Sequence, residues 1–322
     1  MRQTDRKRFT DPSVIEKIKE IESSKEVQAR LQSAREGIKQ RTFSFEKITW
    51  QVVMAAFFIL LILSKLDLTF ILVFIMFFFM GPIKKFLDKR RNEKSKAYVD
   101  NFLLPTLNEI FPDTEVKYHE GLKINVLEKF FPYEEKFFGN CHIIFEDEFN
   151  TEFSNAQAVH YVSDSDGNDE RVVVFCGQVL LINMHTNIKG HIRVVPVLKK
   201  GMFGKKKHGI YGEIDKDERE IETESIEFNE SYSIFSTDDF YSRLILDPNI
   251  MEILNNWKRK MRVILYMNED YISVAFNSGE YLFEVPKTIA EIEELSLSSE
   301  YEEIREKLVD LYELIDLIKQ KL

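Results

Sequence analysis

Histidine and cysteine, the side chains best suited to metal binding and acid–base chemistry, are few and scattered in this sequence. The histidines are His119, His142, His160, His185, His191 and His208. No HExxH or CxxC spacing occurs, and the adjacent Cys141 and His142 would point to opposite sides of a strand. His142 and His160 would share a sheet face only as neighbours on adjacent strands. Packed or exposed histidines are the simpler interpretation, so the sequence predicts no metal ion and no cofactor.

The carboxylates give neither a catalytic nor a calcium-binding pattern. In DSDGNDE (164–170), a calcium loop that begins at Asp164 needs Gly at its sixth position and Glu at its twelfth, where Asp169 and Phe175 stand. The acidic run EIDKDEREIETE (213–224) is interrupted by Lys and Arg, as in a solvated loop or edge. No G-x-S-x-G, P-loop or Ser-His-Asp order is present. We therefore predict no catalytic residue.

One basic loop could bind an anionic surface. The stretch LKKGMFGKKKHG (198–209) gathers lysines around an apolar pair within an otherwise acidic region. Each lysine near an anionic leaflet contributes about 1 kcal/mol, and the apolar side chains would enter the interface. The alternative is a solvated hairpin tip. The residues of this predicted membrane-surface contact are Lys199, Lys200, Met202, Phe203, Lys205, Lys206 and Lys207.

Charge is distributed unevenly along the 322 residues, whose formal net charge is −10. Residues 1–47 carry 12 Lys/Arg against 8 Asp/Glu, and residues 84–96 carry 7 against 2, whereas residues 97–322 carry 24 against 43. An acidic domain is poorly suited to nucleic acid, whose binding rests on Lys and Arg at the phosphates. The two cysteines, Cys141 and Cys176, are too few for a disulfide framework and suit buried thiols in a reducing cytosol.

Residues 48–86 form the most apolar block of the chain. As one helix this block would be about 58 Å long, roughly twice the ~30 Å hydrocarbon core, with Lys65 and Asp67 near its middle. Two spans, 48–64 and 68–86, place those charges at a turn in water, so we predict a transmembrane helical hairpin. A re-entrant hairpin and a core hairpin of a soluble protein are the alternatives.

Basic residues at both outer ends of this block predict its orientation. The basic residues before it are Arg35, Lys39, Arg41 and Lys47, whereas the turn between the spans has only Lys65. The positive-inside rule then places both termini in the cytoplasm of a two-span cell-membrane protein. The topology-setting residues after the second span are Lys84, Lys85, Lys89, Arg90 and Arg91.

Helices are predicted at both ends of the chain. The amphipathic N-terminal segment (1–47) contains a helix over 11–41 with Asp11 as its N-cap, which would lie on the membrane, pair with a partner or dock on its own domain. Near the C-terminus, Ser299 and Glu302 form a capping box before a long apolar stripe. That stripe either packs on a sheet or self-associates as a short coiled coil.

The predicted fold class is α+β, with an N-terminal helix, the transmembrane hairpin, a mostly antiparallel β domain with flanking helices and a long C-terminal helix. Residues 87–96 would be a basic juxtamembrane linker and residues 97–322 an acidic cytoplasmic domain. Helices are expected over 98–111 and 246–260, and a hairpin turn at Asp166-Gly167. Strands are expected within 140–147, 156–163, 171–183, 190–198, 225–236, 261–267, 271–276 and 280–285.

Three segments resemble a known family in their order and spacing. They are RVVVFCGQVLLINMHTNIKGHIRVVP (171–196), FSTDDFYSRLILDPNIMEILNNW (235–257) and VILYMNEDYISVAF (263–276). They resemble a family of bacterial membrane-anchored proteins known only as a domain of unknown function, over residues 97–320. The resemblance implies a bacterial source and a transmembrane hairpin before one soluble domain, but no activity and no catalytic residues. It also suggests a LemA-like membrane-anchored helical bundle as a partner.

These features together predict a membrane-anchored, cytoplasm-facing binding or scaffold protein with a role in envelope maintenance. Its expected partners are the lipid bilayer and another membrane protein or a second copy of the chain, and not nucleic acid. The alternative is a membrane-tethered enzyme that acts on a lipid or a nucleotide. A deep pocket that brings carboxylates together with His142, His160 or Cys141 would favour that alternative.

Overall fold

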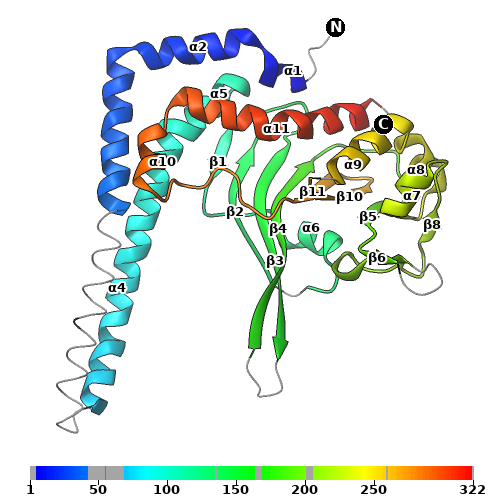
Figure 1. The fold of residues 1–322 in the computed structure, drawn as a ribbon, viewed down its shortest axis with the longest axis horizontal. Coiled ribbons are helices and arrows are strands. Elements are labelled where there is room, and N and C mark those ends of the chain that lie inside the picture. The colour runs from blue at the N-terminus through cyan, green and yellow to red at the C-terminus, as the bar shows by residue number, and fades with distance from the viewer. Residues whose placement is uncertain are drawn as a thin grey trace. The chain divides into compact units, whose positions relative to one another are not determined.

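The computed structural model describes residues 5–42, 55, 69–134, 136–163, 169–200, 206–258 and 260–320. Figure 1 shows the fold. The chain divides into two compact units. Unit 1 comprises residues 1–14, 107–284 and 304–322, and unit 2 comprises residues 15–106 and 285–303.

The described helices are, in chain order, α1 (Asp5–Thr10), α2 (Pro12–Ser23), α4 (Thr69–Tyr98), the π-helix η1 (Val99–Leu103), α5 (Leu104–Ile110), α6 (Ile124–Phe130), the 3₁₀ helix η3 (Gly209–Tyr211), α7 (Ile226–Ser231), α8 (Asp239–Ile245), α9 (Pro248–Lys258), α10 (Ile289–Glu294) and α11 (Leu297–Lys319). A further helix covers residues 25–42. The described strands are β1 (Glu115–Lys117), β2 (Lys136–Ile144), β3 (Glu152–Ser163), β4 (Asp169–Ile182), β5 (His191–Pro196), β6 (Lys199–Lys200), β7 (Lys206–Lys207), β8 (Arg219–Ile221), β9 (Tyr232–Ser236), β10 (Arg262–Asn268) and β11 (Ile272–Asn277).

Unit 1 is built on a nine-stranded sheet in the order β1-β2-β3-β4-β11-β10-β5-β9-β8. Every strand pair in it is antiparallel. The predicted α+β class and its mostly antiparallel sheet are therefore confirmed. The hairpin predicted between β3 and β4 is confirmed by the pairing of Ser163 with Asp169, although the turn itself (164–168) lies outside the described residues.

One face of the sheet packs on α6 and the chain that follows it. The side chains of Phe130 and Phe131 are buried against Phe175 from β4 and Tyr211 from η3. The rings of Phe131 and Phe175 lie 4.6 Å apart, and those of Phe131 and Tyr211 lie 6.1 Å apart. Burial of such aromatic side chains contributes several kcal/mol in total, so α6 fixes η3 close to the sheet.

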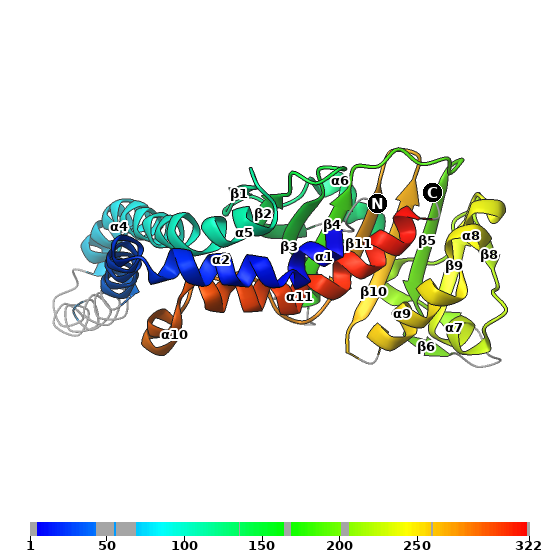
Figure 2. The ribbon, with the colours of Figure 1, turned by 90° about the horizontal axis from the view of Figure 1, so that it is seen from above.

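The opposite face of the sheet packs on helices from both ends of the chain. Phe9 of α1 lies 4.9 Å from Tyr312 of α11, whose ring stacks on Phe111 at 5.4 Å. Figure 2 shows α1 beside the C-terminal half of α11. Farther along the sheet, Trp257 of α9 lies 5.1 Å from Phe276 of β11. The C-terminal helix therefore buries its apolar stripe within its own chain.

Unit 2 contains a long helical run in which α4 passes through η1 into the first residues of α5. The helix over 25–42 has buried apolar residues at Leu31 and Ile38. Its Arg35 side chain donates to the carbonyl of Leu295 at 2.7 Å, and Lys39 pairs with Glu293 at 2.6 Å. The N-terminal arm thus docks on its own chain, which was one of the three alternatives.

Several predicted helix boundaries are wrong. The helix expected over 11–41 is interrupted at Ser24, where the Ser23 hydroxyl donates to the Glu20 carbonyl and competes with the helix. Asp11 does cap α2, since its carboxylate accepts from the Ser13 amide at 2.9 Å. Residues 87–96, predicted as a basic juxtamembrane linker, are helical, because α4 continues through them.

The predicted capping box of the last helix is also displaced. The reciprocal bonds join Ser296 and Ser299, each hydroxyl accepting from the other's amide at 2.9 Å, so α11 begins at Leu297. The carboxylate of Glu22 accepts from the amides of Leu297 and Ser298 at 3.3 and 3.2 Å. A carboxylate at a helix N-terminus is favourable, and no local pattern predicts one supplied from a residue so distant in sequence.

Two of the predicted strands are wrong in whole or in part. Residues 226–231 form α7 because the Ser225 hydroxyl accepts from the Phe228 amide as an N-cap, and only 232–236 are a strand. Residues 280–285 do not pair as a strand, because Phe283 has a φ of 56°. Such a left-handed residue ends an extended segment.

The predicted transmembrane hairpin is not tested along most of its length. The first span (48–64) and the turn at Lys65 and Asp67 lie outside the described residues, apart from Ala55. The second span (68–86) overlaps the start of α4, whose side chains are described only from Lys84 onward. Within the described part of the chain, no helix is both long enough and apolar enough to cross a membrane.

Candidate functional site

The histidines singled out from the sequence lie in separate pairs with carboxylates. His142 Nε2 lies 2.7 Å from Glu152 Oε2, and Asn183 donates to the other carboxylate oxygen at 3.1 Å. The hydrogen bond with His142 lowers the pKa of Glu152, against the opposing effect of burial. His160 Nδ1 lies 3.3 Å from Glu134, whose carboxylate is buried. Both pairs join neighbouring segments of the fold.

These two pairs lie at opposite ends of the β2–β3 ladder. His142 lies in the irregular region between the pairs Asn140–Asn155 and Ile143–Phe153, whereas His160 follows the last pair, which joins Lys136 and Val159. About six residues of β3 separate the two positions, or roughly 20 Å at ~3.3 Å per residue. Cys141 is fully buried. The structure therefore does not bring His142, His160 and Cys141 into one site.

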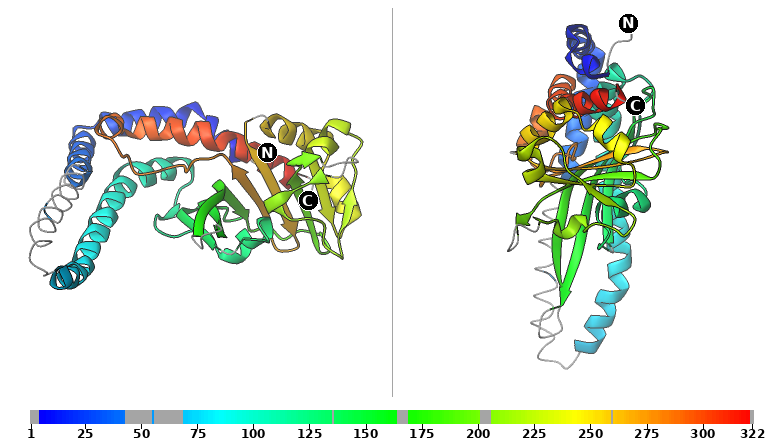
Figure 3. Two further views of the ribbon diagram at one scale, coloured as in Figure 1. Left: turned by 60° about the horizontal axis from the view of Figure 1, so that its bottom comes forward. Right: turned by 90° about the vertical axis from the view of Figure 1, so that its right-hand side faces the viewer.

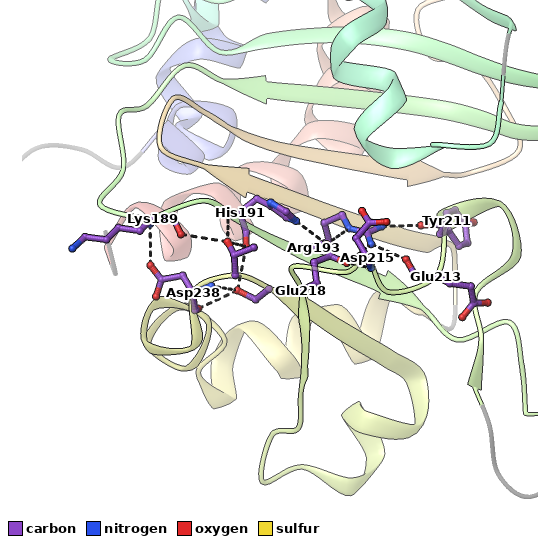
Figure 4. A network of polar contacts seen from close by, with 10 residues as sticks. Lys189, His191, Arg193, Tyr211, Glu213, Asp215, Glu218 and Asp238 are labelled. Atoms are coloured by element: carbon purple, nitrogen blue, oxygen red, sulfur yellow. Dashed lines mark hydrogen bonds and ion pairs between the residues drawn. The ribbon is translucent and has the colours of Figure 1, made fainter.

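No group of three or more His, Cys, Asp or Glu side chains that could hold a metal ion occurs among the described residues. The polar residues that do converge lie elsewhere, at one end of β5 and β9 (Figure 4). This polar cluster, which we call the β5 cluster, comprises Lys189, His191, Arg193, Tyr211, Glu213, Asp215, Glu218, Thr237 and Asp238. Sequence reasoning missed it because the acidic run 213–224 reads as a solvated loop.

A tight turn lies at the start of the β5 cluster along the chain. The amide of Lys189 donates to Asp238 at 2.9 Å and the amide of His191 donates to the Thr237 hydroxyl at 2.8 Å. Between them Gly190 has a φ of 97°, and a Cβ there would lie 2.1 Å from the same hydroxyl oxygen, so only glycine fits. Two of the sequence segments that carry the family resemblance, 171–196 and 235–257, therefore meet in direct contact here.

A buried ion pair forms the centre of the β5 cluster. Arg193 donates from Nε and Nη2 to the two oxygens of Glu218, each at 2.7 Å, and Figure 4 shows the pair side by side. Arg193 also donates to the carbonyls of Tyr211 and Glu213 at 3.1 and 3.0 Å. Its guanidinium lies 5.2 Å from the ring of Phe235. The arginine thus fastens the loop after η3 to β5.

Both oxygens of the Glu218 carboxylate, like the guanidinium of Arg193, have hydrogen-bond partners within the fold. Besides Arg193, it accepts from the Asp215 amide at 2.8 Å and lies 2.7 Å from His191 Nε2. Burial alone would raise the pKa of Glu218, but the hydrogen bonds with Arg193 and His191 outweigh it and lower that pKa to about 2. With its side chain fully buried and both oxygens engaged, Glu218 is held as a structural anion and is not available as an acid or base.

A second arrangement resembles a hydrolase triad at first sight. His208 Nε2 lies 3.0 Å from the Ser233 hydroxyl, and His208 Nδ1 lies 3.3 Å from Glu213. However, the Ser233 hydroxyl donates its single proton to Glu220 at 2.9 Å, so His208 acts as donor to it and not as its base. Ser233 is also buried within β9, where no substrate reaches it. The contacts of a triad are present, but its chemistry is not.

The predicted membrane-surface loop is only partly described. β6 and β7 pair as Lys199–Lys207 and Lys200–Lys206, which confirms a hairpin, while Met202, Phe203 and Lys205 lie outside the described residues. Lys206 donates to Glu220 at 3.0 Å, and this bond helps to lower the pKa of Glu220 against the larger effect of burial. Lys206 is therefore engaged within the fold, whereas Lys207 is exposed.

The outer part of β3 and β4, which we call the ribbon, comprises residues 159–163 and 169–175. β2 pairs with β3 only as far as Val159, and β11 pairs with β4 only from Gln178. In Figures 1 and 3 the two strands therefore extend beyond the rest of the sheet. Val172 and Val173, which point to opposite faces, are 38% and 42% exposed.

One face of the ribbon and of the adjoining β2 combines aromatic and basic side chains. Lys136 Nζ lies 4.2 Å from the ring centre of Tyr161, and the guanidinium of Arg171 lies 5.5 Å from that of Phe138. The register places all four residues on the same face as Val173. This face therefore combines the exposed apolar side chains of Phe138, Tyr161 and Val173 with two cations.

Comparison with known proteins matches part of the sequence to a family model and gives no activity. No curated protein matches the sequence. The crystal structure of the mycobacterial trehalose monomycolate transport factor A, TtfA, covers 67% of this chain and 93% of its own, at 8% identity and a TM-score of 0.31. Residues 173–320 match the model of a family described as protein of unknown function (DUF3137), a span that holds the whole β5 cluster. The chain thus carries a DUF3137 domain over residues 173–320, which confirms the expected domain of unknown function.

Proposed function

We propose that this protein is a membrane-anchored binding protein that faces the cytoplasm and takes up an extended segment of a protein partner along the ribbon. The observation that supports it most is the free edge of β4. Over Asp169–Phe175, β4 has β3 on one side and, among the described residues, no strand on the other.

The free edge offers backbone donors and acceptors for an added strand. Six or seven residues at ~3.3 Å each give an edge of roughly 20 Å, long enough for a short segment to pair along it. After Phe175 the backbone of β4 already has a partner on this side, because the Gly279 amide donates to the Cys176 carbonyl at 2.9 Å. Soluble proteins usually protect an edge with charges or prolines, and residues 169–171 of this edge are charged. Val172, Val173 and Val174, which follow them, carry no charge.

The chemistry of the polar clusters supports binding over catalysis. In the clusters around Glu218, Glu152 and Ser233, the donors and acceptors are matched within the fold. An active site needs at least one acid, base or nucleophile that is directed at a substrate. The alternative of a membrane-tethered enzyme has no comparable observation in its favour.

The anchor of this proposal is the hairpin over 48–64 and 68–86, with both termini in the cytoplasm. Four of the five topology-setting residues, Lys84, Lys85, Lys89 and Arg91, are exposed on α4, and Arg90 lies over the Phe86 ring at 4.6 Å. A hollow of about 500 Å³ along the same helix is lined by Lys85, Asp88, Lys89, Asn92, Glu93 and Lys96. Cations at this position suit an anionic cytoplasmic leaflet.

The test is affinity purification of the full-length chain from native membranes with quantitative proteomics. The test variant V172K/V173K places charge on both faces of the free edge. The matched control I226K/F240K alters two other exposed apolar residues, on α7 and α8. We expect the wild type and the control to recover one stoichiometric protein partner and the test variant to lose it at least tenfold.

Either of two results would overturn the proposal. The first is recovery of no stoichiometric partner by the wild type. The second is equal recovery by V172K/V173K. A second copy of the chain or a LemA-like protein would each count as the partner, and chemical cross-linking to the ribbon would show which one occupies the edge.

A further inference from the structure

A buried carboxyl group lies where α4 ends and α11 begins, within unit 2. The Glu300 side chain belongs to the first turn of α11, and the residue is 4% exposed. The hydroxyl of Tyr98, the last residue of α4 and itself 1% exposed, donates to Glu300 Oε2 at 2.7 Å. A carboxyl group buried this deeply is favoured in its neutral form unless cations surround it.

The charged groups around Glu300 do not favour its ionisation. On its own helix Glu303 adds repulsion, and the Glu22 carboxylate of α2 caps the same helix end. From α4 the group that faces it is the Tyr98 hydroxyl. Within the described chain no Lys, Arg or His pairs with Glu300. Burial raises the pKa of Glu300 to about 8, even though the Tyr98 hydrogen bond opposes that rise.

The backbone beside this pair is irregular in a way that allows movement. Tyr98 directly precedes η1, a π-helical segment in which the Leu104 amide donates to the Val99 carbonyl. A π-turn holds one residue more than an α-turn, so it is a weak point in a long helix and is often found at functional sites. The side chains of Phe102 and Leu103 in η1 are fully buried.

We propose that Tyr98 and Glu300 form a proton-dependent latch that holds the end of α4 and the π-turn η1 against the first turn of α11. With Glu300 protonated, the Tyr98–Glu300 bond joins two neutral groups and the latch is closed. When Glu300 ionises, a carboxylate must remain in an apolar site, and opening the contact to water relieves that cost. The opened contact frees η1 to change its helical register.

The direction of the pH effect on latch opening, and the pH range over which it occurs, follow from the number of protons bound in the closed and open states. In the open state Glu300 has its ordinary pKa of 4.5, and in the closed state its pKa is about 8. Between these values the closed state holds one more proton, so the opening equilibrium should rise about tenfold per pH unit and level off above the closed-state pKa. The latch is therefore tightest in acid and loosens across neutral pH.

The experiment is hydrogen–deuterium exchange of the full-length chain in nanodiscs, with peptides that cover residues 95–106 and 296–303. After correction for intrinsic exchange, protection should fall about a hundredfold from pH 5.5 to pH 7.5. Glu300→Gln keeps an acceptor for Tyr98 but cannot ionise, so its protection should not depend on pH. Glu306→Gln, an exposed change on the same helix, should behave as the wild type.

Tyr98→Phe separates the latch from a merely structural contact. The Tyr98 hydrogen bond lowers the pKa of Glu300, so its loss should extend the window of falling protection to higher pH. Wild-type protection that does not vary with pH would overturn the proposal. The same would follow if Glu300→Gln kept the wild-type pH dependence. Neither result depends on whether the ribbon binds a partner.

Discussion

Breaking the Arg193–Glu218 pair should destabilise unit 1 far more than removing the pair as a whole. Glu218→Leu leaves a buried guanidinium with two of its hydrogen bonds lost and no counter-charge. Truncating one partner of such a pair costs about 3–5 kcal/mol, whereas replacing both by apolar residues is often close to neutral. We therefore expect Arg193→Met/Glu218→Leu to be at least about 2 kcal/mol more stable than Glu218→Leu alone.

The pair should also set the acid sensitivity of unit 1. The folded pKa of Glu218 is about 2 against an ordinary value of 4.5. Because the folded value is depressed, the stability is fully present above pH 4.5 and is lost as pH falls towards 2. The loss amounts to about 3 kcal/mol in total. Glu218→Gln should remove this part of the pH dependence, whereas the exposed Glu222→Gln should leave it intact.

The assay is urea unfolding followed by the fluorescence of Trp257, which is buried against the sheet, with Trp50 replaced by Phe. The free energy of unfolding would be measured at pH 7, pH 5 and pH 3 for each variant. The reasoning fails if Glu218→Leu costs less than about 1 kcal/mol at pH 7. It also fails if the stability lost in the double variant equals the sum of the losses in Arg193→Met and Glu218→Leu. Such additivity would mean that the two residues do not interact.

Two further predictions concern the hydrogen bonds between Asn155 and Leu282 and the predicted membrane anchor. Asn155 is fully buried and bonds both the amide and the carbonyl of Leu282. Asn155→Leu should therefore cost about 2–3 kcal/mol in urea unfolding and expose 278–285 to proteolysis, unlike the exposed Asn249→Leu. Changing Lys84, Lys85, Lys89, Arg90 and Arg91 to Glu should disturb orientation. An impermeant thiol reagent would then reach Cys176 from the outer side of the membrane, and labelling unchanged from the wild type would refute the predicted topology.

Local patterns predicted the elements of unit 1 well, since their signals lie in neighbouring residues. Alternating apolar runs gave β3, β4, β10 and β11. The helix expected over 246–260 is α9, and the carboxylate of Asp247 caps it by accepting from the Ile250 amide at 3.0 Å. In the segment 280–285, where a strand was expected, Phe283 is left-handed and a distant residue, Asn155, bonds both backbone groups of Leu282. Long-range hydrogen bonds of this kind leave no periodic trace in a sequence.

The β5 cluster was missed for a related reason. Glu218 stands in EIDKDEREIETE among residues that are mostly exposed, and nothing in that run distinguishes the one carboxylate that becomes fully buried. Its partners Arg193 and His191 alternate on β5, as two residues on one strand face must. A strand with charged residues at alternate positions beside an acidic loop is a weak signal for such a cluster, which only the fold can complete.

The hydrogen bonds of the polar clusters limit where function can reside in this chain. A buried polar group must be matched, and the clusters around Glu218, Glu152 and Ser233 are matched by their own chain, so they stabilise the fold without offering a group to a ligand. The β4 edge differs because, among the described residues, no strand pairs with its backbone on one side, and a second chain can take that place. Glu300 differs because its buried surroundings favour the protonated carboxyl group over the ionised carboxylate. Among the described residues, the proposed binding edge and the proposed proton-sensitive helix junction are therefore favoured as places where the structure can respond to something outside itself.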